Sequence, residues 1–205
     1  MIVPAIIAKT QRELEGMLCR VSGKARRIML DVMDGAFVPG ASLDFDFKLP
    51  SGLEYEAHLM VEGPLDWVRE KADDVDIAIM QVETLDNIKA AVDYVKGRGL
   101  RVTLALNPET ELDAVLPYLR EVHGILIMTV SPGRYGGQFL PETLEKVRRL
   151  REIDGAIPIE VDGGMNPENA RLARDAGANI FASGSYILKS GDTEKAIKEL
   201  KDAVS

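Results

Sequence analysis

Two segments, one early and one late in the chain, each end an apolar run with an aspartate and then glycine. They are Ile28–Gly35 (IMLDVMDG) and Ile157–Gly164 (IPIEVDGG), and the aspartates of interest are Asp31 and Asp162. Aspartates at the carboxyl ends of two strands of a closed parallel barrel can face each other across one site. Two such carboxyl groups, one protonated and one ionised, can remove a proton from one face of a carbon and return it on the other. An ordinary aspartate in a turn after a strand is the alternative for each of them.

The chain has two histidines, and they occupy different kinds of position. His58 lies near the end of a predicted strand, which makes it a candidate for catalysis or metal binding; a structural histidine is the alternative. His123 precedes a predicted strand and would lie at the opposite end of a barrel, where residues serve stability. We predict that His123 is solvated.

Two glycine-rich loops are candidates for binding phosphate. One spans Ser131–Gln138 (SPGRYGGQ) and the other spans Ser183–Ser185 (SGS). Glycine lets backbone N–H groups approach oxygen atoms closely, and phosphate sites are frequent on this rim of a barrel. Glycine turns are common everywhere, so the stronger signal is that both loops share one rim with Asp162–Gly164.

Three methionines, Met33, Met60 and Met128, lie near the ends of predicted strands. Methionine usually fills irregular space in a core. An apolar cap over a reacting carbon is the functional alternative, and spacing alone does not choose between the two.

The elements that would position these residues alternate between strand and helix along the whole chain. Predicted strands are Ile2–Ile7, Arg27–Val32, Tyr55–Met60, Ile77–Val82, Arg101–Leu106, Gly124–Val130, Ile157–Val161 and Ile180–Ala182. Predicted helices are Gln11–Val21, Pro64–Lys71, Leu85–Lys96, Glu111–Leu119, Pro141–Ile153, Pro167–Asp175 and Asp192–Ala203. Several strands are apolar almost throughout, as in parallel sheets that are covered on both faces.

This alternation predicts an α/β fold, a (β/α)8 TIM barrel, as a single domain over residues 1–205. One crossover, Gly35–Pro50, has no helical period and should lack a helix. An open doubly wound sheet is the alternative, but no GxGxxG motif follows the first strand.

Composition limits the possible partners and location. The net charge of −8 argues against nucleic acid as a main partner. No apolar run approaches the roughly 18 residues of a membrane span, and the N-terminus lacks the features of a signal peptide. The single cysteine, Cys19, excludes a disulfide within one chain and is predicted to be a small buried residue. We therefore expect a cytoplasmic protein that binds neither nucleic acid nor membrane.

Taken together, the aspartate, histidine, methionine and glycine motifs described above match a known family. The sequence resembles ribulose-phosphate 3-epimerase, a (β/α)8 isomerase that interconverts the pentose phosphates ribulose 5-phosphate and xylulose 5-phosphate in carbohydrate metabolism. The residues that carry the resemblance are Asp31–Pro39 (DVMDGAFVP), His58–Met60 (HLM), Met128, Ser131–Gly133, Gly136–Gln138, Glu160–Gly164 (EVDGG), Asn166–Pro167 and Gly184–Ser185.

The resemblance implies roles for these residues. Asp31 and Asp162 would be the acid–base pair, and together with His58 they would also be ligands of a divalent metal, zinc or iron. The metal would stabilise the enediolate formed when the proton leaves C3. The residues implied in substrate and phosphate binding are His58, Gly133, Gly136, Gly137, Gly163, Gly164, Gly184, Ser185, Met33, Met60 and Met128.

The sequence also departs from the family pattern. Met29 stands where the family has a histidine that is a fourth metal ligand, so metal binding is expected to be weak or absent. Ala5 replaces a serine, and Ala36 and Gln81 replace histidines. The PGFGGQ loop of the family is one residue longer here (PGRYGGQ), with Arg134 added.

Three hypotheses follow. The first is a divergent ketose-phosphate 3-epimerase that moves a proton between Asp31 and Asp162. The second is an epimerase or other enzyme for a different phosphosugar, with Arg134 and Tyr135 as the change in specificity. The third is a non-catalytic relative that binds a phosphometabolite. Such barrels often form homo-oligomers, and we expect the same here by analogy.

Overall fold

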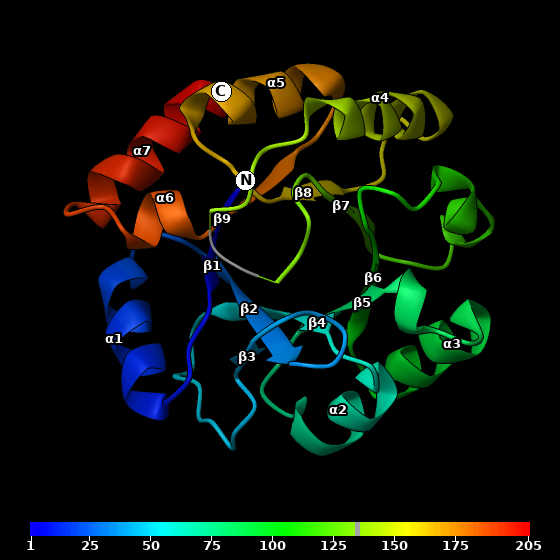
Figure 1. Ribbon diagram of the computed structural model, residues 1–205, viewed down its shortest axis with the longest axis horizontal. Helices are drawn as coiled ribbons and strands as arrows, with labels where there is room; N and C mark the ends of the chain where they lie inside the picture. Colours follow the sequence, from blue (N-terminus) through cyan, green and yellow to red (C-terminus); the bar gives the residue numbers. More distant parts are fainter. Residues whose placement is uncertain (134–135) are drawn as a thin grey trace.

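The computed structural model describes residues 1–133 and 136–205, and its centre is a closed barrel of parallel strands (Figure 1). Strand order and the pairing of β1 with β2 close the barrel. Its strands are β1 (Ile2–Ile6), β2 (Arg27–Asp34), β4 (Glu54–Met60), β5 (Ile77–Gln81), β6 (Arg101–Leu106), β7 (Gly124–Met128), β8 (Ile159–Asp162) and β9 (Ile180–Ser183). The predicted (β/α)8 TIM barrel is confirmed.

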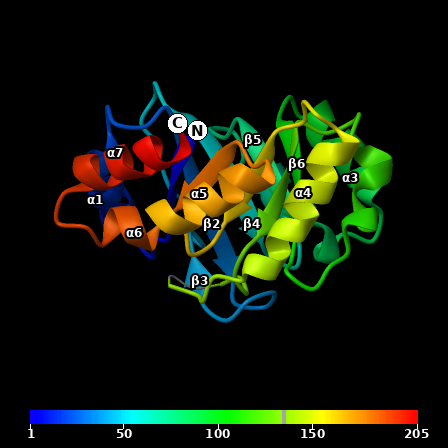
Figure 2. The same cartoon turned by 90° about the horizontal axis from the view of Figure 1, so that it is seen from above.

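Helices surround the barrel on the outside (Figures 1 and 2). They are α1 (Gln11–Val21), α2 (Pro64–Lys71), α3 (Ile88–Gly97), α4 (Leu144–Ile153), α5 (Pro167–Ala176), α6 (Ser185–Leu188) and α7 (Thr193–Val204). Side-chain caps fix several starts: the side chains of Thr10, Asn87 and Asn166 each accept a backbone N–H three residues on. None of the helices in the described ranges combines the length and the apolar character needed to cross a membrane.

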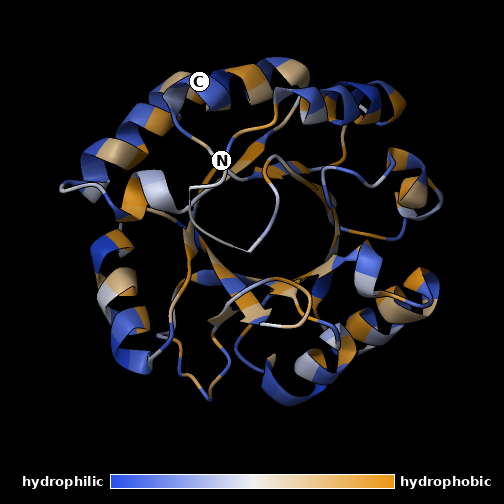
Figure 3. Ribbon diagram, viewed as in Figure 1, coloured by the Kyte–Doolittle hydropathy of each residue, from blue (hydrophilic) through white to orange (hydrophobic). Residues whose placement is uncertain are grey.

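Alternation along each strand divides the core into two shells. In β2, Ile28, Leu30 and Val32 pack outward against the helices. Met29 packs inside the barrel, and Asp31 shares that inward face because side chains alternate along a strand. The hydropathy pattern agrees, with apolar strands at the centre and helices that are polar on their outer faces (Figure 3). The barrel interior is therefore filled by packed side chains.

Some elements differ from the prediction. The segment Glu111–Leu119 forms two short 3₁₀ turns, Leu112–Ala114 and Leu116–Tyr118, instead of one helix. Pro117 explains this, because its ring and missing N–H are incompatible with a helix interior. The short helix α6 was not predicted.

The crossover between β2 and β4 lacks a helix, as the sequence predicts. It contains instead the two-residue strand β3 (Ala41–Ser42), which pairs antiparallel with the end of β2. The prediction that Cys19 is buried is wrong. Cys19 is exposed on the outer face of α1, whereas Leu18 beside it is buried.

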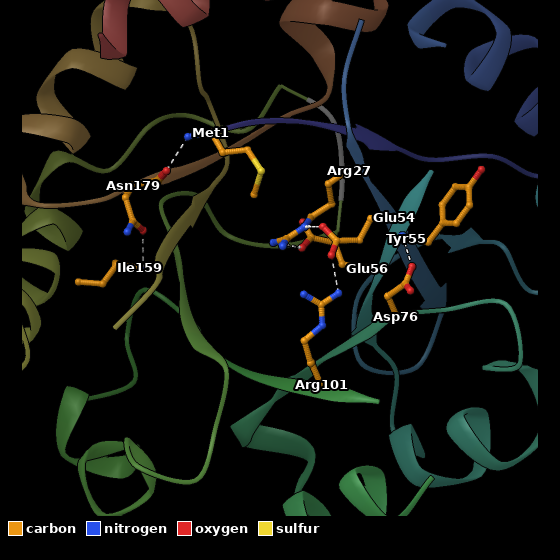
Figure 4. A network of polar contacts seen from close by, with 9 residues as sticks. All are labelled: Met1, Arg27, Glu54, Tyr55, Glu56, Asp76, Arg101, Ile159 and Asn179. Carbon is orange, nitrogen blue, oxygen red and sulfur yellow. Dashed lines mark hydrogen bonds and ion pairs between the residues drawn. The ribbon is translucent and has the colours of Figure 1, made fainter. Parts of the chain in front are cut away.

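An ion-pair network closes the end of the barrel where the strands begin (Figure 4). The guanidinium of Arg27 pairs with Glu54 and, at 3.2 Å, with Glu56. Arg101 pairs with the other oxygen of Glu54 at 2.5 Å. His123 lies at this same end, in the field of Arg101, and is partly buried instead of fully solvated; burial and that positive charge lower its pKa.

Candidate active site

Asp31, His58 and Asp162 meet inside the opposite end of the barrel, where the strands end. The ring Nδ1 of His58 lies 3.3 Å from Oδ1 of Asp31 and 3.6 Å from Oδ2 of Asp162. Asp31 and His58 are direct neighbours across β2 and β4, whereas Asp162 comes from β8. The two predicted carboxylates therefore do face one site, with the histidine between them.

Burial and neighbouring charges change how Asp162 and His58 hold protons. Burial, followed by the negative charge of Asp31, raises the pKa of Asp162 to about 7. Burial alone would lower the pKa of His58, but its hydrogen bond to Asp31 and the charges of both aspartates outweigh this and raise it. Asp162 can thus gain and lose a proton near neutral pH, as an acid–base group must.

A pocket opens directly above this cluster. Asp31 and Asp162 form part of its floor, and Met60 and Met128 lie beside them. Loops after the strands complete the wall, and those of the predicted binding residues that line it are Gly133, Gly136, Gly137, Gly163, Gly164, Gly184 and Ser185. His58 and Met33 do not line the pocket. His58 is fully buried under it, and Met33 packs against Met60 and Val38 in the wall behind.

One valine explains why part of this rim must be glycine. A Cβ added to Gly163 would lie 2.4 Å from Cγ2 of Val130, and the φ angle of Gly163 is +114°. A Cβ at Gly137 would lie 2.9 Å from Cβ of Val130. Thr129 adds hydrogen bonds from its Oγ1 to the carbonyls of Asp162 and Gly163, at 2.9 and 2.6 Å. The rims after β7 and β8 are therefore packed together tightly.

A second close approach joins the loops after β2 and β7. Gly133 adopts a φ of +105°, and a Cβ there would lie 2.7 Å from Cβ of Val38. Asp34 fixes the β2 loop by accepting N–H groups from Ala36, Phe37 and Glu62. The residues of the lengthened loop proposed to change specificity, Arg134 and Tyr135, lie outside the described residues.

The four substituted positions have separate environments. Met29 is fully buried on the inward face of β2, and Ala5 lines the pocket. Ala36 lies exposed in the loop after β2. Gln81 is fully buried at the end of β5, and its side-chain Nε2 lies 3.0 Å from Nε2 of His58.

Sequence reasoning missed Val130 and Met165, which also line the pocket. The alternation of side chains carries a signal for Val130, because it lies two residues beyond Met128 in the predicted strand Gly124–Val130, although β7 itself ends at Met128. Met165 lies in the loop after β8, where no periodic pattern predicts its direction.

The cluster is consistent with a divalent metal. Ligand atoms of Asp31, His58 and Asp162 all lie within 4.8 Å of one another. Two carboxylate oxygens and one imidazole nitrogen form a donor set that suits zinc, iron or manganese. The side chains of the chain itself therefore fit such an ion.

Comparison with known proteins gives one consistent result. A family model described as the Ribulose-phosphate 3 epimerase family matches residues 1–188. The ribulose-phosphate 3-epimerase of Chlamydia muridarum is 36% identical over 177 residues, which are 80% of this chain and 77% of that protein. That of Methanocaldococcus jannaschii is 35% identical over 182 residues, 85% of this chain and 77% of that protein. A crystal structure of 3-hexulose-6-phosphate synthase matches all of both chains with a TM-score of 0.71 and 16% identity, which shows a shared fold.

Proposed function

Because the chain belongs to the ribulose-phosphate 3-epimerase family, we propose that it interconverts ribulose 5-phosphate and xylulose 5-phosphate. The observation that carries the proposal is the pair Asp31 and Asp162, which lie around one histidine at the floor of the pocket. Their charges repel, and the pKa of Asp162 is raised to about 7. Near neutral pH the pair can therefore hold one proton between two carboxyl groups.

The proposed reaction is proton transfer at C3 of the sugar. The ionised carboxylate removes the C3 proton from one face and leaves an enediolate. The protonated carboxyl then donates its own proton to the opposite face, so that the configuration at C3 inverts and the pair has exchanged roles. The reverse reaction uses the same two groups in the opposite order.

His58 supports this transfer by holding the two carboxylates. Its Nδ1 lies within reach of both, so it fixes their directions and balances part of their negative charge. Asp31, His58 and Asp162 would hold the divalent cation, for which zinc and iron are the proposed identities. Such a cation stabilises the negative charge that develops on the sugar oxygens.

The glycine rim is the proposed phosphate site. Gly163 and Gly164 adopt positive φ angles, which turn the backbone sharply beside the pocket. Gly184 and Ser185 stand at the start of α6, where backbone N–H groups lack partners within the helix. Backbone donors suit an anion in a chain whose net charge is −8, since they need no lysine or arginine.

The test is to incubate the protein with ribulose 5-phosphate in D₂O and follow C3 by NMR. Deuterium at C3 together with xylulose 5-phosphate supports the proposal. Asp31→Asn and Asp162→Asn should each slow epimerisation by about 10²- to 10⁴-fold, because each removes one of the two proton carriers. Any residual exchange should be confined to one epimer, and to opposite epimers in the two variants.

The matched control is Asp113→Asn, which changes an exposed carboxylate paired with Arg149 and should leave the rate unchanged. Near-normal epimerisation by Asp162→Asn would contradict the two-carboxylate mechanism. All variants should keep the thermal stability of a folded barrel.

A different phosphosugar is the second candidate substrate. Ala5 favours it, because this residue lines the pocket at a position where the family pattern has a serine hydroxyl. Exchange with another ketose phosphate but not with ribulose 5-phosphate would select this candidate. Binding without exchange for every sugar tested would select the non-catalytic relative. The cytoplasmic location and homo-oligomeric assembly expected from the sequence stay predictions.

A further inference from the structure

Gln81 is a buried polar residue that has no role in the reaction described so far. It ends β5, is 0% exposed, and lies against the far side of the His58 ring from the two aspartates. We propose that Gln81 is a positioning residue that supports His58 as a cation ligand by accepting a hydrogen bond from its outer ring nitrogen.

The two nitrogens of the His58 ring face different partners. Nδ1 faces Asp31 and Asp162, at 3.3 and 3.6 Å. Nε2 faces the amide of Gln81, at 3.0 Å. The ring is fully buried, and among residues 1–133 and 136–205 the amide of Gln81 is the hydrogen-bond partner that Nε2 faces. Only Nδ1 is directed to the position where the carboxylates would share a cation.

With its amide Nε2 turned to the ring, Gln81 donates and ring Nε2 accepts. The ring proton then resides on Nδ1, where it is donated to Asp31. In this arrangement the Oε1 atom of Gln81 is buried without a hydrogen-bond partner among residues 1–133 and 136–205. A buried acceptor without a partner is unfavourable, so this arrangement leaves part of the side chain unsatisfied.

Cation binding would reverse the hydrogen bond between His58 and Gln81: ring Nε2 would become the donor and Gln81 the acceptor. Nδ1 must lose its proton to become a ligand, and the neutral ring then carries its proton on Nε2. An amide turned by half a rotation presents Oε1 to that proton, so the orphaned oxygen gains a partner. Histidines that bind metals generally donate their second ring N–H to such an acceptor. The side chain of Gln81 therefore fits both forms of the site.

Cation affinity tests this role directly, measured by titrating the metal-free protein with Co²⁺ and following its visible absorption and heat of binding. Gln81→Met keeps the length and removes the acceptor, and should weaken binding by about 10- to 100-fold. Gln81→Glu keeps the acceptor and should bind as well as the wild type or more tightly. A purely structural role predicts the reverse order, because Met fits an apolar interior and Glu adds a buried charge.

The position of the ring proton, observed by NMR, gives a second readout that does not depend on the visible absorption of a bound metal. The chain has two histidines, so the imidazole nitrogens of the ¹⁵N-labelled protein are few, and a His123→Gln variant assigns them. The Zn²⁺-loaded wild type should show a slowly exchanging N–H on Nε2 of His58. Gln81→Glu should keep this signal, and Gln81→Met should lose it.

Thr103→Val is the matched control. Thr103 is another buried polar side chain, on the neighbouring strand β6, where it pairs in register with Ile79 of β5. It should leave both readouts unchanged. If Gln81→Met does not fold, Gln81→Asn withdraws the amide from the ring and should show the same loss.

The inference rests on the proposed function only for what the cation does in the reaction, because both readouts are taken without substrate. It is overturned if Gln81→Met binds Co²⁺ like the wild type, if Met binds more tightly than Glu, or if the wild type binds no Co²⁺. Loss of epimerisation with these readouts intact would contradict the proposed function alone.

Discussion

At the scale of single residues, Asp162 differs from a surface aspartate because its neighbours act on it from two sides. Burial and the charge of Asp31 favour its protonated form, whereas the positive character of His58 favours its ionised form. The balance leaves its pKa at about 7. A carboxyl group in that range can give and accept a proton at similar rates, which a reversible epimerisation requires.

Met29 provides a prediction at this scale. It lies two residues before Asp31 on the same inward face of β2 and is fully buried. Met29→His should tighten Zn²⁺ binding by roughly tenfold or more, equivalent to about 1.4 kcal/mol, because an imidazole is a better ligand than a thioether. Calorimetric titration of the metal-free protein measures this.

Met29→Leu is the companion variant and should bind Zn²⁺ like the wild type. If leucine weakens binding, the sulfur of Met29 is itself a ligand and the interpretation of this position is wrong. Thermal unfolding of both variants separates binding from folding, since a buried imidazole without a cation is expected to reduce stability.

Sequence reasoning at the residue scale predicted the pair of aspartates but not the contact between His58 and Gln81. Each aspartate follows an apolar run; Asp162 directly precedes glycine, and Asp31 is followed three residues later by Asp34–Gly35. The contact joins β4 to β5, where His58 is in register with Ile79 and not with Gln81. It depends on strand tilt and on side-chain direction across the barrel, which residue spacing does not encode.

At the scale of elements, Lys146 fastens α4 to the loop that follows β6. Its Nζ donates to the carbonyls of Asn107, Pro108 and Thr110, at 3.0, 2.7 and 2.5 Å. Burial lowers its pKa, yet three acceptors surround the ammonium group. Between β6 and β7 the chain forms two 3₁₀ turns and no α-helix. The Lys146 contact therefore connects this segment to the neighbouring helix α4.

Lys146→Met should therefore lower the free energy of unfolding by about 1–3 kcal/mol, because carbonyl groups lose their donor. Urea denaturation followed by circular dichroism measures the change. Lys198→Met is the control: Lys198 pairs with Asp202 on the exposed face of α7, and its loss should matter by less than about 0.5 kcal/mol. Equal losses in the two variants would contradict the anchoring role.

Elements were predictable where one periodicity dominates. Capped amphipathic helices such as α1 and α5 begin where the sequence predicts. The segment Glu111–Leu119 has helical spacing of its apolar residues, but Pro117 prevents the hydrogen bonds that spacing alone suggests. The strand β3 has only two residues, too few for any pattern, and exists because it pairs with the end of β2.

At the scale of the whole molecule, the two ends of the barrel carry different kinds of polar group. The end where strands finish holds Asp31, His58 and Asp162 under the pocket. The other end holds the network of Arg27, Glu54 and Arg101. Figure 2 shows the loops after β2 and β7 at the end opposite to both chain termini. The candidate active site and this ion-pair network therefore lie at opposite ends of the barrel.

The ion pairs of Glu54 predict how the free energy of unfolding depends on pH. Burial would raise the pKa of Glu54, but hydrogen bonds from Arg27 and Arg101 outweigh it and lower the pKa below the ordinary 4.5. A lowered folded-state pKa adds stability above that ordinary value, and the addition is lost as pH falls through the lowered value. Glu54→Gln should therefore lose about 1 kcal/mol at about pH 7 and less at about pH 3, where more of the carboxylate is protonated.

Urea unfolding at several pH values measures the difference. Glu145→Gln, at an exposed carboxylate paired with Arg148, should show no such dependence. A loss from Glu54→Gln that is equal at both pH values would mean that packing, and not charge, is what this residue contributes.

The barrel as a whole was predictable because the alternation of strands and helices extends from end to end. The ion-pair network at the end where the strands begin could not be predicted. Its members Arg27, Glu54 and Arg101 are distant in sequence, and each resembles an ordinary residue at the start of a strand. Their meeting follows from closure of the barrel, which brings together strand starts that no local pattern relates.

Val130 also constrains the order in which this pocket can change during evolution or directed selection. Any side chain at Gly137 would meet Val130 at once, so a smaller residue at position 130 has to come first. Gly163 could not be substituted even then, because its φ of +114° disfavours any residue with a side chain, whatever space is available. New substrate shapes are therefore reachable through positions 130 and 137, in that order, and libraries that vary 137 alone should return almost only glycine.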